Sequence, residues 1–244
     1  MIIYPEVHLA RFIKRPNRFI AECQLIDSGE IVTVHVKNTG RCKELLFPDT
    51  EVALSYQASE KRKTDYDLIA VKKVEEWINI DSQVPNQLAS EGLLEKKILL
   101  PGLAGEICSL KREQKFGNSK FDILVETDQG EQAFVEVKGM TLENNEIGAF
   151  PDAPTIRGLK HVEELIKAKK IGYQCYVLFI IQFEKVKTAT IHEKMQPSLA
   201  EAISLGQKAG VHVLAYSCQV SPATIDIQKQ IPFELNQEFE DPNR

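Results

Sequence analysis

Residues 121–139 read FDILVETDQGEQAFVEVKG, and this stretch decides the fold. Two runs of β-branched and aromatic residues flank a turn at 128–130, a pattern that predicts a β-hairpin. A three-residue hairpin loop needs a left-handed residue, which Gly130 supplies at low cost. The resulting register places Asp122 on the first strand opposite Glu136 on the second.

The second strand carries an acid and a base two residues apart. Successive side chains of a strand point to opposite faces, so Glu136 and Lys138 share one face. With Asp122 opposite them, two carboxylates and a lysine converge, and burying such a carboxylate pair is costly unless something neutralises it. Mg²⁺ accepts carboxylate oxygens together with a carbonyl and waters, and a neighbouring lysine can orient or help deprotonate an attacking water.

This arrangement predicts metal-assisted hydrolysis of a phosphodiester. Asp122, Glu136 and Lys138 are the predicted catalytic residues, and the two carboxylates are the predicted metal ligands. The alternative is a solvent-facing hairpin whose charged residues form ordinary surface ion pairs of little energetic value.

Polar residues on both sides of the hairpin suit an anionic substrate. Asn118 and Ser119 belong to a turn just before Asp122, and amides of that turn could contact a phosphate or a water. Three cationic or titratable residues follow at helical spacing on the first turns of a helix predicted at 155–170: Arg157, Lys160 and His161. They share one helical face near its positive end, which suits phosphate, although a basic surface helix is the simpler alternative.

The first eighty residues predict a small antiparallel sheet or barrel, because short alternating segments are separated by turn residues. Basic charge is concentrated near the start of this region, in a run of eight residues, 11–18, that contains no acid. Its cations are Arg11, Lys14, Arg15 and Arg18. They are either a solvated strand end or contacts to phosphate.

The pattern changes after residue 80 to alternating helices and strands. The stretch 84–100 has helical spacing with Asn86 as its expected cap, and the tail at 233–244 is expected to fray. Beyond the hairpin and the helix at 155–170, we predict a strand at 174–183, a helix at 197–209 and a strand at 211–219. The chain is therefore a mixed α/β protein, with a β domain at 1–82 and an α/β domain at 83–244.

Composition limits the classes of function. The net charge of −5 gives no general attraction to nucleic acid or anionic membranes, so any basic surface must be local. The five cysteines include no C-x-x-C pair, which argues against a disulfide framework and a zinc site. The longest apolar run, 176–181, is too short to cross a bilayer, and no signal-peptide pattern begins the chain. We expect a cytoplasmic protein with no membrane partner.

Six stretches carry a combination of motifs that is improbable by chance. They are RPNRF at 15–19, VHVKNTGRCKELL at 34–46, KFGNSKFDILV at 115–125, FVEVKGMTL at 134–142, FPDAPTIRGLKHVEEL at 150–165 and VHVLAYSCQVSP at 211–222. Together they resemble the sugar fermentation stimulation protein (SfsA) family over essentially the full chain. The most specific element is FPDA-x-T-x-RG-x-KH.

The resemblance implies an N-terminal OB-like β-barrel and a C-terminal domain of the PD-(D/E)xK nuclease type, with core order αβββαβ. That order requires one more strand, for which 105–114 is the natural candidate. Asp122 matches the metal-binding aspartate of the motif, and Glu136 and Lys138 match its E-x-K. A glutamate of the first helix often assists in that superfamily, which points to Glu91 or Glu95.

Departures from the family pattern occur at two places. Arg41, Cys42 and Lys43 stand after N-T-G, where many relatives have small residues and methionine, so this loop is more basic and Arg41 becomes a candidate phosphate contact. Lys-Gly follows Glu-Val where relatives commonly have Lys-Asn, which leaves the triad intact.

Three functions compete. The first is a Mg²⁺- or Mn²⁺-dependent nuclease acting on nucleic acid, with DNA favoured, in which Arg157 and His161 contact phosphate. The barrel would guide the strand through its basic residues, with Phe12 and Phe19 as stacking candidates that also suit a core. The second is a non-cleaving DNA-binding regulator of sugar metabolism. The third, a carbohydrate-processing enzyme, is weaker because the lysine and nearby cations suit phosphate better than neutral sugar. A homodimer is a further expectation.

Overall fold

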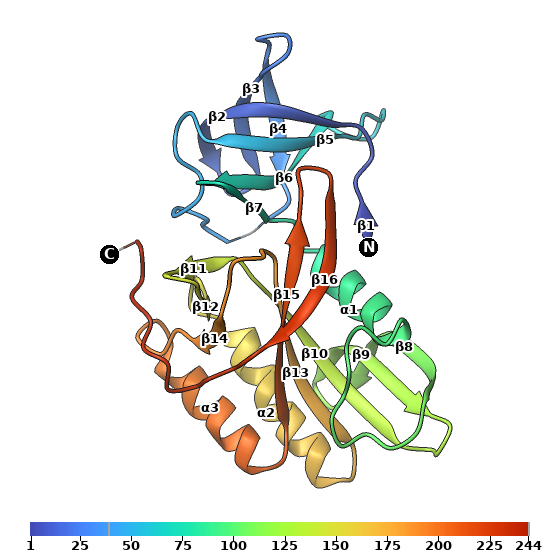
Figure 1. Ribbon diagram of the computed structural model, residues 1–244. Helices are drawn as coiled ribbons and strands as arrows, with labels where there is room; N and C mark the ends of the chain where they lie inside the picture. The colour runs from blue at the N-terminus through green and yellow to red at the C-terminus, as the bar shows by residue number, and fades with distance from the viewer. Residues whose placement is uncertain (39, 244) are drawn as a thin grey trace.

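The computed structural model describes residues 1–38 and 40–243. Thr39, in the middle of the N-T-G motif, and Arg244 lie outside the described residues. The chain forms a β-barrel stacked on an α/β domain (Figure 1). Within the described ranges, no helix combines the length and the apolar character needed to span a membrane.

The N-terminal domain is an OB-type barrel, as predicted. The strand order is β4-β3-β2-β5-β6-β7, and a parallel pairing of β4 with β6 closes the barrel. Alternation along the strands fills its interior with fully buried residues such as Val34, Leu54 and Leu68. The strands are β2 (Val7–Asn17), β3 (Ile20–Leu25), β4 (Ile31–Val36), β5 (Glu51–Tyr56), β6 (Tyr66–Lys73) and β7 (Glu76–Asn79).

The second domain contains the αβββαβ core around a seven-stranded sheet of order β1-β16-β15-β13-β10-β9-β8. Its first strand, β1 (Ile2–Ile3), comes from the N-terminus and pairs with β16. The other strands are β8 (Ile107–Phe116), β9 (Ser119–Thr127), β10 (Gln132–Met140), β13 (Gln174–Ile181), β15 (His212–Val220) and β16 (Thr224–Ile231). The helices are α1 (Val84–Leu94), α2 (Ile156–Lys170) and α3 (Pro197–Lys208).

Helices cover both faces of this sheet (Figure 1). On one face, Phe134 and Phe179 pack in a core with residues of α2 and α3. On the other face, Val135 and Tyr176 pack with residues of α1. The period-two alternation of β10 therefore divides its residues between two cores, and it places Glu136 on the side of α2.

The boundaries of α1 differ from the sequence prediction. The helix begins at Val84, so Asn86 lies inside its first turn and is not the cap. Pro85 is tolerated there because the first amides of a helix have no intrahelical acceptor. The helix ends at Leu94 instead of continuing to residue 100, and Lys96 adopts a left-handed φ of 59°.

The C-terminal tail is ordered against the domain, contrary to the prediction of fraying. Thr190 Oγ1 donates to the carbonyl oxygen of Glu234 at 2.7 Å, and the Phe239 side chain is buried. It packs beside a small sheet that the sequence pattern did not predict, which consists of β11 (Leu142–Asn144), β12 (Ile147–Phe150) and β14 (Thr188–Ile191).

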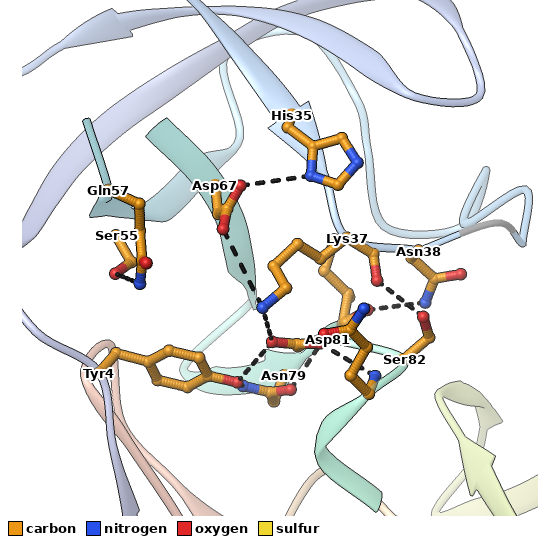
Figure 2. A network of polar contacts seen from close by, with 12 residues as sticks. Tyr4, His35, Lys37, Asn38, Ser55, Gln57, Asp67, Asn79, Asp81 and Ser82 are labelled. Carbon is orange, nitrogen blue, oxygen red and sulfur yellow. Dashed lines mark hydrogen bonds and ion pairs between the residues drawn. The ribbon is translucent and has the colours of Figure 1, made fainter. Parts of the chain in front are cut away.

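A buried polar network joins the two domains (Figure 2). Lys37 Nζ lies 2.8 Å from Asp81 Oδ2, which also accepts a hydrogen bond from the Tyr4 hydroxyl at 3.3 Å. Asn79 Oδ1 accepts a hydrogen bond from Nε2 of Gln182, the residue that follows β13, at 3.0 Å. Buried polar groups of this kind are costly when unpaired, so their mutual pairing favours one orientation of the barrel over the α/β domain.

Candidate active site

The predicted hairpin is present with the predicted loop. The Thr127 amide donates to the Glu131 carbonyl oxygen at 2.9 Å, and Gly130 has a left-handed φ of 79°. The strand register runs from Gln132 opposite Glu126 to Val135 opposite Ile123. One more step along this register brings Asp122 to Glu136, at the point where the two strands stop pairing.

Asp122 is held by one donor from the sheet and one from α1. Its Oδ2 accepts the backbone N–H of Val137 at 2.9 Å, and its Oδ1 accepts Nδ2–H of Asn86 at 3.0 Å. Burial raises the pKa of this carboxyl, and the negative charge of Glu136 raises the pKa further. The aspartate therefore lies in a site that favours an added positive charge.

Glu136 is almost completely buried, with 1% of its surface exposed. Its Oε1 is hydrogen-bonded to both His161 Nδ1 and Lys138 Nζ. Burial acts to raise its pKa, but the hydrogen bond from His161 and the charge of Lys138 outweigh that effect and lower the pKa. Its Oε2 is buried and has no hydrogen-bond partner among the described residues, which leaves a carboxylate oxygen available as a ligand.

His161 lies behind Glu136 instead of facing a substrate. Its side chain is buried, its ring meets the Phe121 ring edge-on, and Arg157 Nε is 3.5 Å from its Nε2. These partners assign the tautomer with Nδ1–H donating to Glu136 and Nε2 accepting from Arg157. The predicted direct contact of His161 with phosphate is therefore corrected: the residue positions a carboxylate.

The turn before Asp122 is tied to α2. Lys160 Nζ donates to the carbonyl oxygen of Asn118 at 2.7 Å, and Thr155 caps the helix by accepting the Gly158 amide at 2.9 Å. Ser119 is buried, and its Oγ has no partner in the described part of the chain. Asn118 and Arg157 are exposed, so these two remain open to a ligand.

The first helix contributes an amide to the site. Glu91 lies 3.5 Å from the N-terminal ammonium and Glu95 lies 3.1 Å from Lys97, so both predicted glutamates have other partners. The residue of α1 that contacts the site is instead Asn86, five residues before Glu91. The sequence showed Asn86 only as a cap, because the approach of α1 to Asp122 depends on tertiary packing.

A divalent cation of the Mg²⁺ type fits these residues. Residues 1–38 and 40–243 contain no cluster of three or more His, Cys, Asp or Glu side chains arranged to hold a metal ion, so a cation would have at most two such protein ligands. The protein would thus supply two carboxylates, Asp122 and the unpaired Oε2 of Glu136. Mg²⁺ commonly binds one or two carboxylates and takes its other ligands from water and substrate phosphate, so a two-carboxylate site is sufficient.

A group of basic residues lies on the barrel, apart from the carboxylate site. Arg15 donates to three carbonyl oxygens, those of Arg41 at 2.8 Å, Arg18 at 2.7 Å and Asn38 at 2.8 Å, and so braces the loop after β4. This loop and the β2–β3 turn line an open hollow of about 470 Å³, whose cationic lining residues are Arg15, Arg18, Arg41 and Lys43. We call this feature the basic hollow.

The other predicted residues of the barrel are not in the basic hollow. Arg11 donates to the Asp49 carbonyl oxygen at 3.1 Å, and Lys14 pairs with Glu22 at 3.2 Å. Phe12 is buried in the core, whereas Phe19 is 52% exposed beside the Arg18 guanidinium. Of the two predicted stacking candidates, Phe19 is therefore the exposed one.

The fold and the site define a class of two-domain proteins, in which an OB-type barrel precedes an αβββαβ domain with D…E-x-K residues on a hairpin. Two family models match the chain: the SfsA N-terminal OB domain at residues 13–80 and the sugar fermentation stimulation protein RE domain at 83–224. The chain belongs to the SfsA family.

Relatives match nearly the whole chain. A sugar fermentation stimulation protein homolog of Enterococcus mundtii is 61% identical over 240 residues, covering 98% of this chain and 99% of the relative. A homolog of Clostridium botulinum is 46% identical over 235 residues, covering 96% and 100%. Among solved structures, Pyrococcus furiosus SfsA in complex with Ca²⁺ superposes with a TM-score of 0.83 at 30% identity, covering 96% of this chain and 98% of that chain.

Proposed function

We propose that this protein is a divalent-metal-dependent nuclease that hydrolyses phosphodiester bonds, with DNA as the favoured substrate. The observation that carries the proposal is the unpaired, buried Oε2 of Glu136 beside Asp122 and Lys138. A buried ionised oxygen without a partner is costly in a purely structural site, whereas a cation-binding site requires one. The Ca²⁺ bound by Pyrococcus furiosus SfsA supports the choice of a hard divalent ion.

Each residue has a role that follows from its contacts. Asp122 and Glu136 would hold Mg²⁺ or Mn²⁺, which supplies Lewis-acid polarisation of a phosphate oxygen and lowers the pKa of a bound water. Lys138 is hydrogen-bonded to Glu136 and would orient the water that attacks phosphorus, and its charge would offset the negative charge that develops on the phosphate. Attack breaks one P–O ester bond and leaves a phosphate monoester and a hydroxyl group.

The rest of the nucleic acid would be bound by two surfaces. Arg157, exposed on the first turn of α2, would contact phosphates near the site. The basic hollow would bind the backbone further along the strand, and Phe19 would stack on a base. Because the net charge is −5, binding by this local patch should be salt-sensitive and of modest affinity.

The deciding experiment measures cleavage of labelled single- and double-stranded DNA and RNA with Mg²⁺, Mn²⁺ or EDTA. Lys138→Ala should lower metal-dependent cleavage by about 10²-fold or more, as expected for loss of a residue that assists proton transfer. Lys120→Ala is the matched control, because Lys120 is an exposed lysine of β9 that pairs with Glu113. Equal cutting by wild type and Lys138→Ala, or no cutting by either, would contradict the nuclease proposal.

A non-cleaving DNA-binding protein is the second candidate, and the basic hollow favours it. Apart from Ala153, the hollow is lined by residues of the barrel and by none of the three proposed catalytic residues, so binding does not require cleavage. DNA binding by a chain that cuts nothing with either metal would establish this function.

A further inference from the structure

A hydrogen bond from α1 helps to fix the orientation of the Asp122 carboxylate. Asn86 lies in the first turn of α1, and its Nδ2 is 3.0 Å from Asp122 Oδ1. The donor must be Nδ2 because an ionised carboxylate oxygen only accepts hydrogen bonds. The start of α1 is close to β10 as well, since a Cβ added to Gly139 would lie 2.8 Å from Pro85 Cγ.

The two donors to Asp122 fix its orientation. The Val137 amide belongs to the sheet and holds Oδ2, while Asn86 belongs to α1 and holds Oδ1. One hydrogen bond on each oxygen determines the plane of the carboxylate and leaves one lone pair on each oxygen. A ligand carboxylate with a fixed plane loses less conformational entropy when it binds a cation.

A neutral amide is suited to this position. Glu136 already brings a second negative charge to the site, and Lys138 and His161 both contact its Oε1. A carboxylate at residue 86 would repel Asp122 and could not donate a hydrogen bond, whereas asparagine donates without adding charge.

We propose that Asn86 is a positioning residue of the active site, which orients Asp122 from α1 and thereby sets the affinity for the divalent cation. This inference rests on the proposed function, because it requires that Asp122 and Glu136 bind a metal ion. Removal of outer hydrogen-bond partners typically weakens metal binding about 10- to 100-fold. The same range is expected for loss of the Asn86 amide.

The test is direct titration of purified full-length protein with Mn²⁺ by calorimetry, without nucleic acid. Asn86→Leu keeps the side-chain size and removes the donor, and Asn86→Ala is a second variant with high helix propensity. The matched control is Gln87→Ala, the neighbouring exposed amide of α1 that donates to Glu91 at 2.8 Å. Thermal unfolding without metal shows that each variant is folded.

Three outcomes are distinct. If wild type and Gln87→Ala bind Mn²⁺ equally and both folded Asn86 variants bind about 10-fold more weakly or worse, the proposal is supported. If wild type and the Asn86 variants bind equally, Asn86 has no positioning role, while the metal site stands. If wild type binds no Mn²⁺ at millimolar concentration, the metal-dependent function fails, and the role of Asn86 fails with it.

Discussion

The buried pair of His161 and Glu136 gives a stability prediction with a definite magnitude. His161→Leu replaces the imidazole with an apolar side chain of similar size, which can still pack against Phe121, and removes the donor to Glu136. Hydrogen bonds to charged groups contribute about 1.5–3 kcal/mol, and Lys138 still pairs with the same oxygen, which limits the loss. We expect the free energy of unfolding to fall by about 2 kcal/mol, which corresponds to a decrease in Tm of about 4–8 °C for a chain of this size.

The assay is urea denaturation at pH 7 followed by circular dichroism, in a double-mutant cycle with Glu136→Gln. Glutamine still accepts a hydrogen bond but carries no charge, so His161→Leu should cost only about 1 kcal/mol in that background. A coupling energy of about 1 kcal/mol between the two substitutions follows. An equal cost of His161→Leu in both backgrounds would refute the reasoning that His161 stabilises a buried charge.

Two further predictions concern the loop after β4. Burial raises the pKa of Glu44, so its ionised form destabilises the folded state at pH 7 and its protonated form does not. Glu44→Gln should therefore increase the free energy of unfolding at pH 7. Urea titrations at lower pH should show this gain vanish below the ordinary glutamate pKa of 4.5, where the carboxyl is protonated in both states. A gain that persists in acid would contradict the prediction. Arg41→Ala should reduce the salt slope of DNA binding by about one, measured by fluorescence anisotropy. Arg11 is the control, because its guanidinium is held by Asp49, and Arg11→Ala should leave the salt slope unchanged. Equal changes in slope for the two variants would argue against binding at the basic hollow.

The hairpin could be predicted from the sequence because its determinants are local. Gly130 fixes the loop, the loop fixes the register, and the register brings Asp122 to Glu136. The spacing of Arg157 and His161 likewise predicted one helical face, and the structure places the two side chains 3.5 Å apart.

The roles of individual residues within that geometry were less predictable. His161 contacts the carboxylate because α2 packs over the face of β10 that carries Glu136, and helix periodicity alone does not specify that packing. Asn86 resembles a cap in sequence, and only the approach of α1 to β9 shows its contact with Asp122. The tail is hydrophilic in composition, yet its two aromatic residues anchor it, because Phe239 is buried and Phe233 stacks on Phe179.

The pairing of β1 with β16 has a consequence for synthesis of the chain. Ile2 pairs with Ile225, so β1 can find its partner only after β16 has been synthesised. The barrel can form early, because β2 to β7 are contiguous in the chain. The edge of the α/β sheet can therefore form only after the barrel strands are in place in the chain, and in a chain truncated before residue 224 the apolar strand β1 has no partner. Unpaired apolar strands promote aggregation, so such truncated chains should aggregate more readily than the complete sheet.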